Sequence, residues 1–194
     1  MSTILRADDL MMVGSDGGGW CAPLGTAQPS DIYTYPPAPW LALGGISGDG
    51  LVVAFDEDSE AFTPWGRTSP SRTVITKSVR TFQITAWESN RPIVQSLMYR
   101  KDIADLAPDV NGVISFAEAG TAAPDRRSFI FDVYDGTVIR RFHLPEAEIT
   151  DRGDTTFKQD EVVAYEWTIS AYPDSAGNIV YHKIVTPEVE AYLS

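Results

Sequence analysis

The stretch Thr81–Arg100, TFQITAWESNRPIVQSLMYR, contains the change of pattern that decides the fold. Apolar residues in its first part alternate with polar ones, as in a strand with one buried face: Phe82, Ile84 and Ala86. The alternation then stops, and Pro92 stands where the first turn of a helix tolerates proline, because an amide there has no intrahelical partner. The apolar residues that follow share one helical stripe: Ile93, Val94, Leu97 and Met98. The pattern therefore predicts a strand that leads into a short helix over residues 91–100.

From residue 73 onward the sequence predicts mainly antiparallel β structure. The patterns indicate strands at 73–86, 112–118, 128–134, 137–144, 162–172 and 179–185, with a further short strand at 145–150. Asp135-Gly136 is a two-residue hairpin signal between two of them. The simplest fold that these elements can form is an antiparallel β-sandwich or barrel of about seven strands with one flanking α-helix. We expect this core over residues 73–187, followed by a C-terminal tail over 188–194.

The size and charge of the chain limit what it can be. Its 194 residues are enough for one domain with a proper core and few for two. A formal net charge of −12 argues against a surface that grips nucleic acid, which would need basic patches. The same charge suits a surface past which a polyanion moves without adhering. The acidity is uneven, because residues 1–70 alone carry a net charge of −7.

Residues 1–50 are rich in glycine and proline, which favour turns and extended backbone. Large apolar side chains nevertheless occur in this N-terminal arm: Trp20, Tyr33, Tyr35, Trp40 and Leu41. An idle linker has no reason to keep such groups in water. We therefore expect the arm to dock either on its own domain or on a neighbouring subunit.

Residues 51–72 are typical of a long acidic loop, although Leu51–Phe55 is compatible with a strand. Loops of some twenty residues in compact domains are usually functional or disordered. Phe62 and Trp65 stand in this segment among proline and glycine residues, and such aromatic side chains favour a function. We expect the segment to make contacts outside its own domain.

The same segment contains three carboxylates at alternate positions, Asp56, Asp58 and Glu60, as a calcium loop does. The glycine expected at the sixth position of such a loop is missing. Arg67 occupies the twelfth position, where a bidentate glutamate is required. We therefore expect a solvated acidic segment and no metal.

The sequence shows no assembled catalytic site. His143 and His182 are its only histidines, and Cys21 is its only cysteine, which is too few for a zinc site or a disulfide framework. Asp8 and Asp9 interrupt the apolar residues that a signal peptide would need, and no stretch approaches the roughly 18 apolar residues of a membrane span. We expect a soluble protein that is not an enzyme, holds no cofactor and does not contact a membrane.

Several short motifs occur in a particular order along the chain. They are Ala22-Pro23-Leu24-Gly25-Thr26, Leu43–Gly50, Pro64-Trp65-Gly66, Trp87-Glu88 and Val162–Glu166. In their order and spacing, over about residues 13–187, the chain resembles the major tail tube proteins of long, non-contractile-tailed (siphovirus-type) bacteriophages, especially those that infect actinobacteria.

This resemblance implies a β-sandwich with one flanking helix, assembled as hexameric rings that stack into a hollow tube for DNA ejection. It implies that residues 51–72 are the stacking element and that the N-terminal arm and the C-terminal tail reach onto neighbours. The implied partners are further copies of the chain and the tape measure, tail terminator and distal tail proteins, with DNA passing through the lumen without specific binding. The protein would be made in the host cytoplasm and reside in the virion tail.

We expect the contacts between subunits to use the arm, the acidic segment and the two basic pairs that flank Asp135-Gly136. The candidate residues are Trp20, Pro23, Leu24, Tyr33, Trp40, Asp56, Asp58, Glu60, Phe62, Trp65, Arg67, Arg126, Arg127, Arg140 and Arg141. The arginines would meet the acidic segment of a neighbouring copy or balance local carboxylates. The alternative function is a β-sandwich module that recognises a glycan or a receptor through an exposed aromatic platform.

Overall fold

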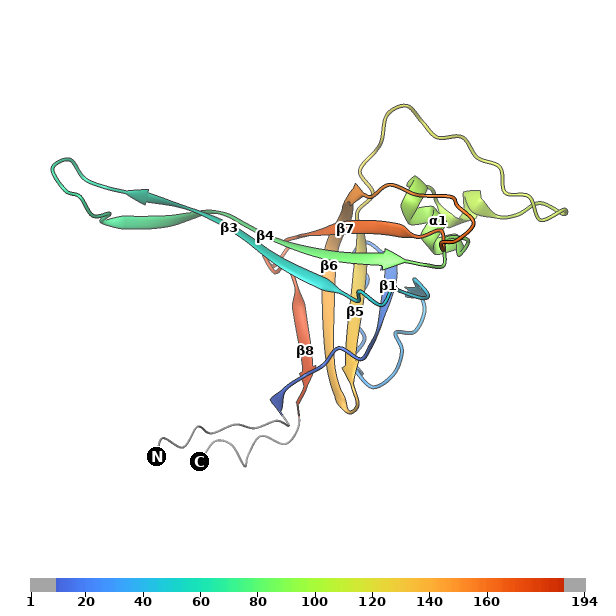
Figure 1. The fold of residues 1–194 in the computed structure, drawn as a ribbon, viewed down its shortest axis with the longest axis horizontal. Helices are drawn as coiled ribbons and strands as arrows, with labels where there is room; N and C mark the ends of the chain where they lie inside the picture. Colours follow the sequence, from blue (N-terminus) through green and yellow to red (C-terminus); the bar gives the residue numbers. More distant parts are fainter. Residues whose placement is uncertain (1–9, 187–194) are drawn as a thin grey trace.

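A computed structural model describes residues 10–186 and shows a mainly β protein with a long projecting hairpin (Figure 1). Within these residues there are eight strands, one α-helix and one 3-10 helix. In chain order they are β1 (Asp16–Pro23), β2 (Leu41–Ala42), β3 (Val52–Phe62), β4 (Arg72–Ala86), α1 (Pro92–Tyr99), η2 (Ile103–Leu106), β5 (Arg127–Asp135), β6 (Val138–Arg152), β7 (Tyr165–Tyr172) and β8 (Tyr181–Val185). All strand pairs are antiparallel, so the predicted fold class is confirmed.

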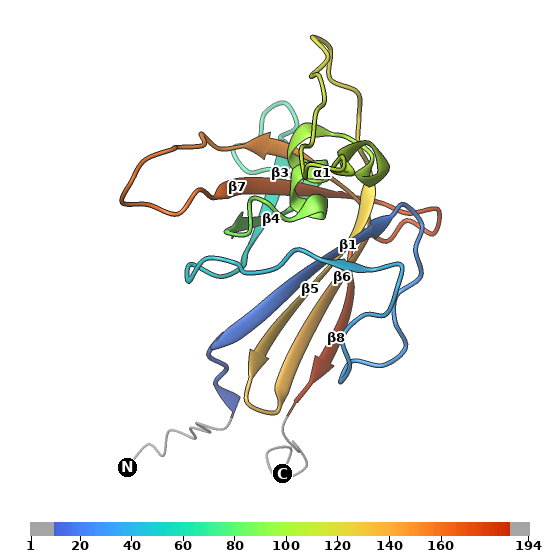
Figure 2. The same cartoon turned by 90° about the vertical axis from the view of Figure 1, so that its right-hand side faces the viewer.

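Strand β6 joins two differently oriented parts of the sheet. Its first part pairs with β5 and β8, and its second part pairs with β7. Pro145 lies between these parts, where the pairing with β5 changes register, and a residue without an amide proton fits such an irregularity. The strand order is β2-β1-β5-β6-β7-β4-β3, with β8 beside β6. Figure 2 shows β4 and β7 running across the direction of β1, β5 and β6.

The segment 43–47 connects the two ends of this arrangement. The Leu43 amide donates to the Gly19 carbonyl of β1 at 2.8 Å, and the Ser47 amide donates to the Thr85 carbonyl of β4 at 2.9 Å. Ile46 also forms an isolated antiparallel bridge with Ala86. Hydrogen bonds therefore run from β1 to β4 through this segment, which gives the sheet the character of a barrel.

The core fills the inside of this barrel and the space beneath α1. Its largest buried side chains include Trp167, Phe82, Phe129 and Phe131. The predicted alternation in β4 and the predicted helical stripe are confirmed, because Phe82, Ile84, Ala86, Ile93, Val94 and Leu97 are all buried in one cluster. Helix α1 ends where Arg100 takes a left-handed conformation with φ of 51°.

Two segments differ from the sequence expectation. Residues 51–72 form no long loop, because β3 and the start of β4 pair as a two-stranded ribbon and leave only residues 63–71 as its connection. Residues 112–118 form no strand and lie largely exposed. The predicted strands 137–144 and 145–150 are one continuous strand, β6. The tail at 188–194 and the first nine residues of the arm lie outside the described residues.

The N-terminal arm is partly integrated into the sheet. Strand β1 pairs with β2 on one side and with β5 along its whole length on the other. Trp20 and Trp40 are buried in a second small cluster with Ala22 and Ile130. Of the two sites that the sequence left open for the arm, its own domain is therefore the one that these tryptophans contact.

The sequence motifs Leu43–Gly50 and Trp87-Glu88 contact each other where the segment 43–47 passes β4. The Gly45 amide donates to the Glu88 carboxylate at 2.7 Å, and Arg91 donates to the same carboxylate at 2.7 Å. Hydrogen bonding by the Gly45 amide, then by Arg91, lowers the pKa of Glu88 below its usual value. Gly44 has φ of 87°, and a Cβ atom there would clash with the Glu88 carboxylate.

We therefore expect Gly44→Ala to destabilise the domain by about 1–3 kcal/mol through its left-handed backbone alone, with a further loss from the clash with Glu88. Chemical denaturation with tryptophan fluorescence measures the change. Gly48→Ala is the matched control, because a Cβ atom at that position would have no atom within 4 Å beyond its own chain neighbours. Equal stability of the two variants would contradict the role assigned to Gly44.

Candidate inter-subunit surfaces

The β3–β4 hairpin projects from the body on the side opposite α1 (Figure 1). It contains several large apolar side chains that are exposed in the protomer: Phe55, Phe62, Trp65 and Ile75. Trp65, at the tip, is fully exposed. Monomeric proteins rarely leave such groups together in water, so the hairpin is a candidate contact surface.

Ion pairs cross the hairpin between acidic residues of β3 and basic residues of β4. Lys77 pairs with Asp56 and lies 4.0 Å from Asp58, while Arg80 donates to Glu57 at 2.7 Å. The hydrogen bond and the charge of Asp56 raise the pKa of Lys77. Arg80 also lies over the Phe55 ring at 4.4 Å. These cross-strand contacts lie in solvent, and each is worth little alone.

The predicted residues at the outer end of the hairpin remain free of ion pairs. Among the described residues, Glu60 and Arg67 pair with no opposite charge. They flank Phe62 and Trp65, so the tip presents apolar and charged groups side by side. Six predicted site residues therefore lie on one structural element: Asp56, Asp58, Glu60, Phe62, Trp65 and Arg67.

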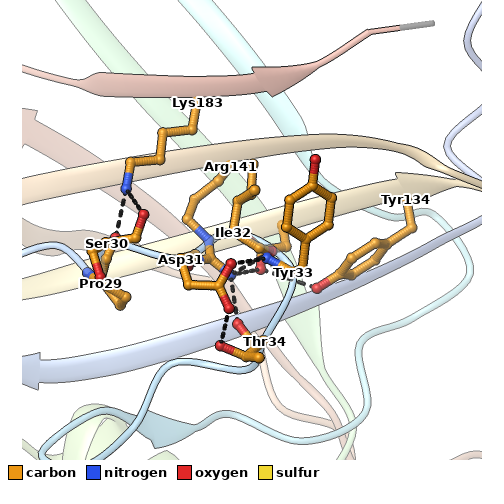
Figure 3. A network of polar contacts seen from close by, with 10 residues as sticks. Pro29, Ser30, Asp31, Ile32, Tyr33, Thr34, Tyr134, Arg141 and Lys183 are labelled. Atoms are coloured by element: carbon orange, nitrogen blue, oxygen red, sulfur yellow. Dashed lines mark hydrogen bonds and ion pairs between the residues drawn. The ribbon is translucent and has the colours of Figure 1, made fainter.

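Residues 24–40, which we call the strap, cross the outer face of β1, β5, β6 and β8. Arg141 of β6 holds the strap by donating to the carbonyls of Asp31 at 2.7 Å and Thr34 at 3.2 Å (Figure 3). Lys183 of β8 donates to the carbonyls of Pro29 at 2.6 Å and Ser30 at 2.9 Å. These hydrogen bonds all use backbone carbonyls of the strap. The aromatic side chains of the arm predicted that it docks, but its sequence does not show that these carbonyls are bound.

A buried ion pair lies beneath the strap. Arg141 and Asp132 are both fully buried, and two parallel hydrogen bonds of 2.7 Å join them. Burial lowers the pKa of Arg141, but the hydrogen bonds and charge of Asp132 outweigh it and the pKa is raised. Tyr134 donates to Asp132 at 3.0 Å, and burial raises its own pKa to about 12.

Aromatic side chains also pack between the strap and the sheet. The rings of Trp20 and Tyr35 lie 5.9 Å apart, and those of Trp40 and His143 lie 5.7 Å apart in an edge-on arrangement. Burial lowers the pKa of His143 to about 4, so this imidazole is neutral at pH 7. Tyr33 and Leu24, in contrast, are exposed on the strap and are available to a neighbour.

The four predicted arginines lie in three different environments. Arg141 is buried and Arg140 is exposed, because successive residues of a strand point to opposite faces. Arg126 pairs with Glu146 and lies 4.2 Å from the centre of the Tyr172 ring. Arg127 donates to Asp125 at 2.8 Å. Three of them balance carboxylates of their own chain, which was one of the two roles that the sequence left open.

A groove of about 630 Å³ opens beside α1, between the ends of β1 and β2 and residues 123–127. Apolar side chains in its lining include Pro39, Leu41, Ile93 and Ile103. Its charged residues are Arg100, Lys101, Asp102, Asp125, Arg126 and Arg127, of which Arg100 and Arg126 pair with Glu148 and Glu146 beside the groove. Of the residues that line the groove, only Pro23, Arg126 and Arg127 are among the predicted inter-subunit residues. No signal in the sequence joins its four segments, because the fold alone brings them together.

A family model described as phage tail tube protein matches residues 6–186. The chain belongs to this family. Among solved structures it is similar to a chain of an extracellular contractile injection system, described as a PVC sheath/tube terminator in the extended state. The identity is 10%, the TM-score is 0.43, and the match covers 91% of this chain and 99% of that chain. No curated protein sequence matches the chain.

Family membership makes the chain a structural component of a virion tail. The family is not an enzyme family, so the prediction that the chain is no enzyme is confirmed. Over residues 10–186 no group of three or more His, Cys, Asp or Glu side chains could hold a metal ion. In the same part of the chain, every helix is too short or too polar to cross a membrane.

Proposed function

We propose that the chain forms rings of six copies that stack into the hollow tube of a long, non-contractile phage tail, and that the host is an actinobacterium. The single observation that carries the proposal is the projecting β3–β4 hairpin with its exposed apolar side chains. Such a hairpin has no core of its own, and an isolated two-stranded ribbon is marginally stable in water. Contact with a neighbouring ring would bury these groups.

The arrangement of free strand edges supports closure into rings. Strand β8 pairs only with β6 and strand β3 only with β4 among the described residues, so each leaves one edge unpaired. An unpaired edge is a template for a strand of another chain. A contact that closes by rotation gives a ring, and a head-to-tail contact that does not close gives a stack; a tube needs both. The exposed strap residues Leu24 and Tyr33, together with Arg140, are proposed to take part in these contacts.

The charge of the chain fits a conduit for DNA. Six copies at −12 each give a ring a formal charge of about −72. Acidic groups that face the lumen would repel phosphates over a Debye length of about 8 Å, so the genome would slide and not adhere. Within the tail we propose contacts with tape measure, tail terminator and distal tail proteins, after synthesis in the host cytoplasm.

The experiment is negative-stain microscopy of the purified chain, combined with mass measurement over a range of concentrations. We expect rings or tubes whose fraction rises with concentration, and a mass per ring that equals six chains. A chain that remains monomeric at every concentration and salt would contradict the proposal. Quenching of the fluorescence of Trp40 or Trp65 by glycans in such a monomer, measured as loss of quenching when that tryptophan is replaced, would favour the alternative binding module.

A further inference from the structure

We propose that the groove beside α1 receives the hairpin tip of a second copy, with Trp65 as the side chain that enters it. This inference rests on the proposed stacking, and it names the surface on which the stacking contact falls. Figure 1 places the hairpin and α1 at opposite ends of the long axis. Figure 2, which views the α1 side, shows the hairpin directed away behind the body. One protomer therefore presents a projection at one end and a cavity at the other, as a head-to-tail stack requires.

The size and lining of the groove suit an aromatic anchor. Its volume of about 630 Å³ lies within the roughly 300–1,000 Å³ of pockets that bury ligands. Leu41 lines it and is exposed to solvent, while Ile93 and Ile103 provide apolar surface behind it. A fully exposed tryptophan gains most from such a site, because tryptophan is a frequent hot-spot residue at interfaces and fills apolar pockets.

The charges of the two surfaces are complementary. Among the described residues, Lys101 in the groove and Glu60 near the hairpin tip have no ion pair within the protomer. Most of the other charges of both surfaces are paired within the protomer: Asp56, Asp58 and Glu57 with Lys77 and Arg80 on the hairpin, and Arg100, Arg126 and Arg127 with Glu148, Glu146 and Asp125 at the groove. The complementarity therefore rests mainly on Lys101 and Glu60. An ammonium group beside the indole would also attract its π face. Arg67 at the tip and Asp102 in the groove offer a second pair of opposite sign.

The test is site-directed cross-linking of assembled protein. Thr63→Cys places a thiol beside Trp65 on the hairpin, and Ala123→Cys places one on the rim of the groove; both positions are exposed. A short bis-maleimide should link the double variant into covalent multimers. The matched control replaces Ala123→Cys by Ala119→Cys, which is exposed in the same loop but outside the groove lining. We expect at least tenfold more cross-linked product with Ala123→Cys.

The native thiol needs its own control, because Cys21 also lines the groove. Cys21 is buried and its pKa is raised to about 12, so the single Thr63→Cys variant should give no product. Adding Trp65→Ala to the double variant should reduce the product at least tenfold if the indole enters the groove.

The outcomes separate this inference from the proposed function. If intact tubes cross-link equally through Ala119→Cys, or do not cross-link through Ala123→Cys, the groove is not the receiving site. The proposed tube is unaffected by either result. Cross-linking that persists unchanged after Trp65→Ala overturns Trp65 as the anchor. Failure of the unmodified chain to form rings or tubes overturns both proposals.

Discussion

Arg141→Leu is expected to destabilise the protein by about 3–5 kcal/mol, since removal of one partner leaves Asp132 charged and buried. The loss is large against a typical stability of about 5–15 kcal/mol. It corresponds to a decrease in Tm of roughly 6–20 °C for a domain of this size. The reason is geometric: both side chains are fully buried, and two hydrogen bonds of 2.7 Å join them.

The adjacent residue provides the control. Arg140→Leu changes the same side chain at an exposed position one residue away, and we expect it to alter stability by less than about 0.5 kcal/mol. Differential scanning calorimetry of the two variants makes the comparison. Similar Tm values for both would show that the pair beneath the strap does not support the fold.

A double variant separates the effect of the ion pair on the stability of the fold from its effect on the position of the strap. Arg141→Met with Asp132→Leu removes both charges, and such replacements are often neutral for stability. The strap carbonyls of Asp31 and Thr34 still lose their donor. We expect stability to recover while amide hydrogen exchange in residues 30–34 becomes faster. Unchanged exchange there would mean that other contacts hold the strap.

Truncation of the hairpin is expected to abolish stacking while the domain still folds. Residues 59–76 would be replaced by Asn-Gly, which forms a tight turn between Asp58 and Lys77, paired residues in the ladder. No residue of the buried core lies in the deleted stretch. Loss of two aromatic anchors worth about 2 kcal/mol each weakens each contact about 1,000-fold. Microscopy and sedimentation should therefore show rings or monomers and no tubes.

Substitutions in the full-length hairpin test whether stacking depends on its aromatic side chains or on its length. Phe62→Ser with Trp65→Ser keeps the hairpin and should also prevent stacking. Phe157→Ser removes an exposed aromatic ring outside the hairpin and should leave the tubes unchanged. Tubes of normal length from the truncated chain would refute the stacking role, and a truncated chain that fails to fold would place the hairpin in the core.

The sequence predicted those elements that bury one face. In β4 and β7 alternate residues enter the core, and in α1 one stripe does, so the period of the apolar residues reveals each element. Strand β3 exposes nearly every residue on both faces, so its acidic run lacks this period and resembles a loop. Its regularity comes from pairing with β4, a contact that no local pattern encodes.

The candidate site could be predicted only in part. Composition identified the exposed aromatic residues of the hairpin, because large apolar groups among turn residues are visible in any window of sequence. It assigned Trp20 and Trp40 to a neighbour as well, since turn-rich sequence does not show which surface lies beneath it. Arg140 and Arg141 look alike in sequence. Which one is buried depends on which face of β6 the strap covers.

Strand β4 has a mechanical consequence for the assembled tail. A single run of 15 residues extends from the outer hairpin to side chains at the centre of the molecule. Tension applied at the tip pulls β3 and β4 together and acts along β4, perpendicular to the hydrogen bonds that join β4 to β7. These hydrogen bonds must then break at the same time and not one after another. A tail tube that stacks through these hairpins, as proposed above, should therefore resist stretching along its axis.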